Sequence, residues 1–168
     1  RRHTRSFHVT GVQTCALPIF AASADKVFEF LVVPEKMLRW MGLAVDLDPR
    51  PGGIYRVTPN EREVIRGEFV EIVPNRKVSF TWGWERGGPD VPAGSTRVDI
   101  ELIPENGGTR VRLVHNHLPN AVREQHAFGW NHHFGRLKVA AEGGDPGPDP
   151  CWSDVQQFPP RQTQEVLK

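Results

Sequence analysis

The sequence between residues 96 and 117 is TRVDIELIPENGGTRVRLVHNH, and it governs the expected fold. Apolar and polar side chains alternate before and after Asn106-Gly107-Gly108, a pattern typical of two antiparallel strands joined by a tight turn. The first strand is predicted over Thr96–Ile103 and the second over Thr109–His117. The second strand is expected to place four residues on one face: Val111, Leu113, His115 and His117. A hairpin of this length with one apolar face predicts a sheet that packs against another layer.

Further strands are predicted before this hairpin. Alternating segments indicate strands over Ile54–Val57, Val64–Val73 and Lys77–Trp84. Gly52-Gly53 breaks the chain before the first of these strands, and Pro74-Asn75 marks a turn between the second and the third. Short strands joined by tight turns in this order predict an antiparallel meander.

Helices are predicted on either side of the strands. Ser23 is a candidate N-cap for a short helix that ends before Pro34, and a second short helix is predicted over Glu35–Trp40. The buried side of this second helix is expected to comprise Met37, Leu38, Trp40 and Met41. A long helix is predicted over Ala121–Glu142 and ends at Gly143-Gly144. Its apolar stripe is expected to consist of Ala127, Trp130, Phe134, Leu137 and Ala141.

This order of elements predicts an α+β domain in which a curved antiparallel sheet wraps around the long C-terminal helix. Such a sheet and helix often leave a cavity between them, because their curvatures do not match everywhere. The tail from Asp145 onward is rich in proline and polar residues and lacks a period, so we expect it to be irregular.

The first nineteen residues resemble the translation of a common short-read sequencing adapter. The segment 1–19 is therefore interpreted as non-native, and the natural sequence is expected to start near Phe20. The full chain carries 21 basic and 20 acidic residues. Without Arg1, Arg2 and Arg5, 18 basic residues face those 20 acidic ones, so the formal charge changes from +1 to −2.

The remaining composition excludes several classes of protein. A slightly acidic chain offers no basic patch or stripe for nucleic acid. No run of 18 apolar residues occurs, so no membrane span is expected. Cys151 is the single cysteine outside the adapter-like segment, and nothing therefore points to an oxidising compartment. We expect one domain located in the cytoplasm.

Six segments together resemble one family of bacterial proteins. They are PEKMLRWMG (34–42), PGGIYRV (51–57), GEFVEI (67–72), FTWGW (80–84), GTRVRL (108–113) and HAFGW (126–130), the last followed by Arg136-Leu137. In order and spacing they are similar to the bacterial homologues of the activator of the heat-shock-protein-90 ATPase, within the SRPBCC (START-like) superfamily. The resemblance covers about residues 20–150.

The resemblance implies a helix-grip fold with a deep apolar pocket under the C-terminal helix, and it implies no catalytic residue set. Members of the family usually begin with a strand before the first short helix, and the adapter-like segment occupies those positions here. The native first strand is therefore expected to be lost, and the foreign segment either mimics it or leaves a sheet edge unpaired. The expected organisation is a non-native segment 1–19, a START-like domain 20–144 and an irregular tail 145–168.

The candidate pocket residues are aromatic side chains and histidines on the predicted strands and helices. They are Trp40, Phe69, Phe80, Trp82, Trp84, His115, His126, Trp130 and Phe134. Their alternative role is core packing, and the sequence does not separate the two roles. His126 and His133 share a helix face with His132 beside them, but no Asp or Glu lies at ligand spacing among these histidines. We therefore expect neither a metal nor a cofactor.

Three functions are compatible with these features. The first is a small binding protein that holds a hydrophobic or amphipathic molecule between the sheet and the last helix. The second, which the family name suggests, is a co-chaperone-like interaction domain in the stress response that activates the heat-shock-protein-90 ATPase. The third is a cyclase- or aromatase-like enzyme, although no residue set in the sequence requires catalysis. Ligand binding is favoured.

Overall fold

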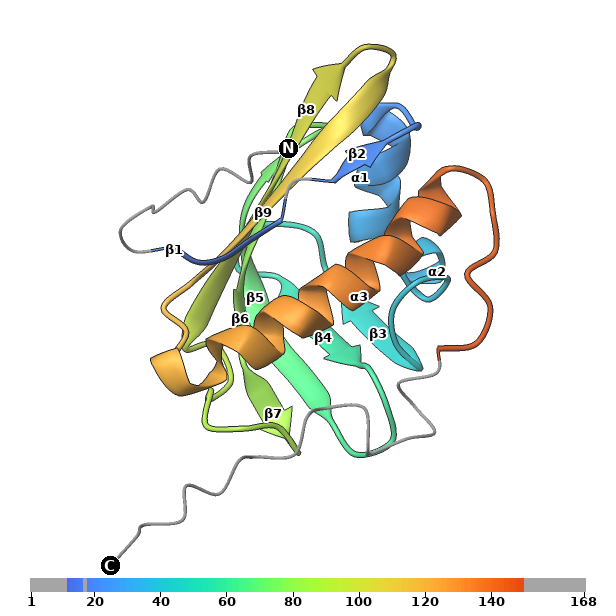
Figure 1. The fold of residues 1–168 in the computed structure, drawn as a ribbon. Coiled ribbons are helices and arrows are strands. Elements are labelled where there is room, and N and C mark those ends of the chain that lie inside the picture. The colour runs from blue at the N-terminus through green and yellow to red at the C-terminus, as the bar shows by residue number, and fades with distance from the viewer. Residues whose placement is uncertain (1–11, 17, 150–168) are drawn as a thin grey trace, which may run out of the picture.

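The computed structural model describes residues 12–16 and 18–149 and shows an α+β domain. A curved antiparallel sheet carries the long helix α3 (Arg123–Ala141) across one face. Two short helices, α1 (Ala24–Val32) and α2 (Pro34–Met37), lie near the C-terminal half of α3 (Figure 1). The expected helix-grip fold is confirmed. None of the described helices combines the length and the apolar character needed to cross a membrane.

The sheet is a meander whose edge is closed by the N-terminal segment. Its strands are β1 (Val12–Ala16), β2 (Ile19–Phe20), β3 (Ala44–Leu47), β4 (Ile54–Thr58), β5 (Val64–Val73), β6 (Lys77–Trp82), β7 (Trp84–Arg86), β8 (Thr96–Glu105) and β9 (Gly108–Asn116). They are ordered β1-β9-β8-β6-β5-β4-β3, with β2 also on β9 and β7 also on β5. From β3 to β9 the neighbours follow the chain order, apart from β7, as the predicted antiparallel meander requires. Strand β3 was not predicted from the sequence.

The hairpin of β8 and β9 turns where the sequence predicts it. Asn106 and Gly107 have φ angles of 48° and 77°, the left-handed pair that a tight hairpin turn requires. Strand β9 ends at Asn116, one residue earlier than predicted. His117 has a φ of 68° and is exposed, so the prediction that it shares the buried face of His115 is wrong.

Strand β5 pairs with β4 along one edge and is divided between two strands, β7 and β6, along the other. Its first residues pair with β7, its last residues pair with β6, and register shifts interrupt both pairings. Gly67 lies between the two halves, and a Cβ at this position would be 1.7 Å from the carbonyl oxygen of Thr81. Glycine therefore permits a close backbone approach here, and the register shifts contribute to the curvature of the sheet around α3.

The first two helices largely follow their predicted signals. Ser23 occupies the N-cap of α1, but its side chain makes no cap hydrogen bond to the backbone. It instead hydrogen-bonds to Asp25 and lowers the pKa of that carboxyl. Helix α2 ends at Met37 rather than at Trp40. Leu38 is 42% exposed, so its predicted place on the buried side is wrong.

Helix α3 is slightly shorter than predicted. The residues Asn120–Val122 form a 3-10 turn, and the α-helix runs from Arg123 to Ala141 rather than over Ala121–Glu142. Its buried residues are His126, Trp130, Phe134, Leu137, Ala140 and Ala141. Four residues of the predicted stripe are therefore buried, while Ala127 is only partly buried.

Aromatic rings fill the core beside α1 and α2. Tyr55 stacks on Phe80 with 3.9 Å between ring centroids, and Phe69 meets both rings edge-on. Trp40 packs edge-on against Phe134 of α3. All five rings are at most 3% exposed. This part of the molecule is tightly packed.

The adapter-like segment supplies strands at the edge of the sheet. β1 pairs antiparallel with β9, where Cys15 lies opposite Val114, and β2 places Ile19 opposite Arg110. Strand pairing uses backbone N–H and C=O groups, which any residue except proline provides. Of the two alternatives, the segment therefore mimics a first strand and covers the edge of β9. Its non-native origin stays a prediction, and Cys151 lies outside the described residues.

The close approach at Gly67 predicts a strong effect of one methyl group. Gly67→Ala should lower the free energy of unfolding by about 1–3 kcal/mol, because the backbone of Thr81 must move. Gly135→Ala is the matched control on α3, where a Cβ meets no described atom of another element within 4 Å. The control should stabilise the protein by about 0.5–1 kcal/mol through helix propensity. Urea unfolding measures both changes, and equal stabilities of the two variants would contradict the proposed contact.

Candidate functional site

A cavity of about 90 Å³ lies beneath the N-terminal half of α3. By the space one water needs, this is room for roughly six to nine waters. Its lining comes from α3, from the strands beneath it and from loops: Met41, Pro59, Asn60, Glu63, Ile65, Trp82, Trp84, Gln125, His126, Phe128, Gly129, Trp130, His132, His133 and Asp149.

Aromatic side chains from two layers form the inner wall of the cavity. Trp82 ends β6 and Trp84 begins β7, and their ring centroids are 4.9 Å apart. His126 on α3 meets the Trp82 ring edge-on at 5.2 Å. Because Gly83 separates the two tryptophans at a break between strands, both rings reach the same cavity.

A buried histidine joins the sheet to the helix behind this wall. The indole N–H of Trp130 on α3 donates to Nδ1 of His115 on β9, at 3.0 Å. The hydroxyl of Thr96 lies 2.8 Å from Nε2 of His115 and donates to the carbonyl oxygen of Trp82 at 2.7 Å. Since that hydroxyl proton is engaged, Nε2–H of His115 is the donor to Thr96. The partners therefore specify the neutral imidazole with its proton on Nε2.

The environment of His115 keeps it uncharged. Burial, aided by the neighbouring His126, lowers the pKa of His115 to about 3. Protonation would place a second N–H against the indole N–H of Trp130, so the hydrogen bonds oppose the charged form as well. His115 therefore has a structural role next to the cavity and does not line it.

His126 is held in the complementary tautomer. Its Nδ1 lies 2.7 Å from the carbonyl oxygen of Val122, so Nδ1 carries the proton and Nε2 retains a lone pair. Burial lowers the pKa of His126, although the bond to Val122 opposes this shift. A neutral imidazole thus presents an acceptor nitrogen in the wall of the cavity.

The candidate pocket residues divide between the cavity and the core. Trp82, Trp84, His126 and Trp130 line the cavity. The other five are packed in the core and are not among its lining residues: Trp40, Phe69, Phe80, His115 and Phe134. The indole N–H of Trp40 donates to the carbonyl oxygen of Phe30, which marks it as a satisfied core residue. Periodicity placed Trp130 and Phe134 in the apolar stripe of the helix and His115 on one face of its strand, but it gave no signal for depth.

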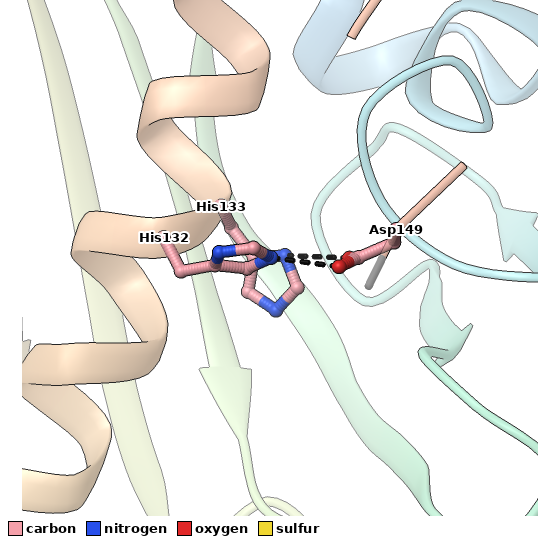
Figure 2. Close-up of side chains that lie close together, drawn as sticks. All are labelled: His132, His133 and Asp149. Carbon is pink, nitrogen blue, oxygen red and sulfur yellow. Dashed lines mark hydrogen bonds and ion pairs between the residues drawn. The ribbon is translucent and has the colours of Figure 1, made fainter. Parts of the chain in front are cut away.

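One end of the cavity is polar and involves a segment remote in sequence. His132 and His133 on α3 reach Asp149, which belongs to the strap, defined as residues 143–149 (Figure 2). Nε2 of His132 is 2.8 Å from the Asp149 carboxylate and Nδ1 of His133 is 4.0 Å from it. Burial lowers the pKa of His133 to about 4, although the Asp149 carboxylate opposes this shift.

An arginine fastens the strap to the domain. The guanidinium of Arg136 donates to the carbonyl oxygens of Pro146 at 3.2 Å and Gly147 at 2.7 Å. It also donates to the carbonyl oxygen of Trp40 at 3.2 Å and lies 3.6 Å from the Asp149 carboxylate. One planar side chain therefore joins α3, the strap and the turn that follows α2. Tail residues up to 149 are thus ordered onto the domain.

The polar end also has the geometry of a metal site. Ligand atoms of His132, His133 and Asp149 lie within 4.8 Å of one another, and imidazole and carboxylate groups are ligands of zinc. The sequence argument that no acid accompanies these histidines is wrong, because the fold brings Asp149 to them. The Arg136 guanidinium next to the carboxylate opposes a second cation, so this cluster suits an ion pair better than a metal.

Other lining residues carry no signal in the sequence. Met41 and Ile65 have the pattern of core residues, and Asn60 and Glu63 belong to a loop between β4 and β5. Gly129 contributes empty space, since a Cβ there would meet nothing within 4 Å in the described neighbouring elements. Only the curvature of the sheet and the tilt of α3 bring these residues to one cavity.

Comparison with known proteins agrees with this architecture. The family model described as activator of Hsp90 ATPase homolog 1-like protein (AHSA1) matches residues 21–142. The chain belongs to this family. An AHSA1-like protein from Rhizobium etli, solved in solution, is 41% identical with a TM-score of 0.67, and the match covers 84% of this chain and 88% of that protein.

More distant relatives share the fold. The mouse (Mus musculus) activator of 90 kDa heat shock protein ATPase homolog 2 is 25% identical over 125 residues. These are 74% of this chain and 36% of the mouse protein, so the chain spans about a third of that relative. DynU16, from the dynemicin biosynthetic locus, is 21% identical with a TM-score of 0.69, over 79% of this chain and 48% of its own. At this identity the likeness concerns the fold alone.

The neutral His115 predicts how the stability of this AHSA1-like protein depends on pH. Its pKa is near 6.5 when unfolded and about 3 when folded, so only the unfolded state takes up the proton between these values. The free energy of unfolding should therefore fall by about 1.4 kcal/mol per pH unit from this group as pH decreases from about 6 to about 4.

The matched variant is His115→Gln, whose amide can still donate to Thr96 and accept from Trp130 but does not titrate. Urea unfolding at several pH values should give a shallower slope for this variant by about that amount. The variant also retains His126 and His133, so their contributions cancel in the comparison. Identical slopes for both proteins would show that His115 is not the group responsible.

The hydrogen bonds from Arg136 to the strap predict that a substitution on α3 changes the strap locally. Arg136→Met should raise hydrogen exchange about tenfold or more in a peptide covering the strap, because its carbonyl partners lose their donor. Lys138→Met is the control, since Lys138 pairs only with Glu142 among its described ion-pair partners and both side chains are partly exposed. Unchanged exchange in the Arg136 variant would argue against a fastening role.

Proposed function

We propose that this AHSA1-like protein binds a hydrophobic or amphipathic small molecule in the cavity between the sheet and α3. The observation that carries the proposal is a cavity of about 90 Å³ whose inner wall is aromatic and whose ends are polar. Ligand sites in proteins commonly combine apolar walls with a few placed polar groups. Natural cores are otherwise close-packed, as the rings around Tyr55 are in this molecule.

Two glycines on one helix allow the proposal to be tested. Gly129 lines the cavity and Gly135 is exposed, and neither would bring a Cβ within 4 Å of another described element. Gly129→Leu should fill the cavity and abolish ligand binding while the helix persists. Gly135→Leu adds the same side chain to the same helix, and it should leave binding unchanged.

Binding would be measured by tryptophan fluorescence and by native mass spectrometry against a panel of one-ring aromatic compounds and short-chain lipids. Trp82, Trp84 and Trp130 line the cavity, so an occupied site should alter their emission. The proposal fails if nothing in the panel binds the unaltered chain, or if both leucine variants bind as well as it does.

A second candidate is activation of the heat-shock-protein-90 ATPase. It is favoured by the family to which residues 21–142 belong, although the chain spans only 36% of the mouse relative. We expect the chain to raise ATP turnover by a purified chaperone if it has this activity. The Gly129→Leu variant would raise turnover equally if the interaction is independent of the cavity. Unchanged turnover with the unaltered chain would exclude this candidate.

A further inference from the structure

Three buried polar atoms in the aromatic wall of the cavity, besides Nδ1 of His133 at its polar end, have no hydrogen-bond partner among the residues that the structure describes. They are Nε1 of Trp82, Nε1 of Trp84 and Nε2 of His126. The indoles of Trp40 and Trp130 differ, since each donates to a protein acceptor. Buried polar groups in native proteins are rarely left without partners, because desolvation without a bond is costly. The exceptions here all belong to residues that line one cavity.

The atom type and its neighbours decide whether each of these atoms donates or accepts a hydrogen bond. An indole nitrogen can only donate, so Trp82 and Trp84 offer two N–H donors. Nε2 of His126 can only accept, because the proton lies on Nδ1 and is bonded to the carbonyl oxygen of Val122. A complementary molecule therefore needs an acceptor oxygen for the indoles and a hydroxyl donor for the imidazole.

These three groups are close enough to meet one small molecule. The Trp82 ring centroid is 4.9 Å from that of Trp84 and 5.2 Å from that of His126, and the remaining pair is 6.1 Å apart. Separations of about 4.5–7 Å are those of aromatic rings in direct contact, so the three rings form one continuous stretch of the cavity wall. A cavity of about 90 Å³ is smaller than the roughly 150 Å³ in which an engineered protein cavity holds benzene, so a one-ring molecule enters only if lining side chains move, and a long lipid chain does not fit.

The charges around the cavity select against an anion. Its described lining includes the carboxylates of Glu63 and Asp149 and no lysine or arginine. His126 is kept neutral by burial, which lowers its pKa. The Asp149 carboxylate is paired with Arg136, but a carboxylate ligand would still enter a site with no lysine or arginine in its described lining and with the Glu63 carboxylate in its wall, which is unfavourable in a partly buried place.

We infer that the cavity takes a neutral one-ring molecule that carries both a carbonyl and a hydroxyl group, the chemical class of hydroxyaryl ketones. The carbonyl oxygen accepts from the Trp82 and Trp84 indoles, and the hydroxyl donates to Nε2 of His126. This inference rests on the proposed function, since it names the ligand class of the same cavity.

The test compares probes that differ in one polar group. The 3- and 4-isomers of hydroxyacetophenone carry both groups, 4-methylacetophenone lacks the hydroxyl, 4-isopropylphenol lacks the carbonyl, and 4-hydroxybenzoate is an anion. In calorimetric titrations of the full chain, the better hydroxyacetophenone isomer should bind about tenfold or more tightly than either neutral analogue, because each analogue leaves a wall group unpaired. The anion 4-hydroxybenzoate should bind more weakly than the better hydroxyacetophenone isomer and both neutral analogues.

Two variants assign the preference to named atoms. His126→Phe keeps a ring beside Trp82 but removes the acceptor, so the preference for hydroxyl over methyl should disappear. Trp84→Phe removes one indole donor and should reduce the preference for carbonyl over isopropyl. Each variant has its own control for folding. The His126 variant should still bind 4-methylacetophenone, which has no hydroxyl group to donate to His126. The Trp84 variant should still bind 4-isopropylphenol, which has no carbonyl group to accept from Trp84.

The outcomes separate this inference from the proposed function. If hydroxyacetophenone and its two neutral analogues bind within about twofold of one another, the cavity binds apolar molecules and the inference is wrong. The same holds if the preferences persist in both variants, or if the anion binds best. If no neutral probe binds the unaltered chain although lipids of the panel do, the ligand class is wrong and the proposed function stands. If nothing binds at all, both fail together.

Discussion

The hydrogen bond from the Trp130 indole to His115 sets the position of α3 over the sheet. It joins the middle of the helix to the C-terminal end of β9, and the Thr96 hydroxyl links the other side of the same imidazole to β6. The chain of bonds is directional, so it fixes the rotation of the helix as well as its height. It also requires a neutral His115.

The two halves of the space under α3 are filled differently. Near α1 and α2, Tyr55 and Phe80 stack closely, and the Trp40 indole is satisfied by a backbone carbonyl. Toward the start of α3, the rings of Trp82, Trp84 and His126 meet edge-on or at a tilt, and polar atoms remain without partners among the described residues. Open volume and unsatisfied polar groups both reduce stability. Open volume and unsatisfied polar groups occur together in this one place. Departures of this kind from regular core packing are typical of binding sites.

Much of the architecture follows from periodicity in the sequence. The alternation around Asn106-Gly107 predicts the hairpin, and spacings of three and four residues predict the buried face of α3. Apart from the missed strand β3, the errors lie at element ends: His117 leaves the strand in a left-handed conformation, and Leu38 follows the last turn of α2. Periodicity carries no information at these positions, because the regular repeat of side-chain directions stops where the chain leaves a helix or strand. The pairing of the adapter-like segment with β9 shows the converse, since a strand at an edge is specified mainly by backbone groups.

The sequence by itself determined the order of the helices and of the strands other than β3, most of the faces that are buried and the family to which the chain belongs. Only the tertiary structure decided that Trp82 and Trp84 border open space while Trp40 and Phe134 pack solidly, and that Asp149 meets His132. The physical reason is that a repeat of two or 3.6 residues fixes the direction of a side chain relative to its own element. How separate elements approach each other decides how deeply a side chain is buried and which hydrogen-bond partners it meets. It also decides that an acid of the strap reaches the histidines of α3. Curvature of the sheet and the tilt of α3 establish that approach, and no local pattern encodes either.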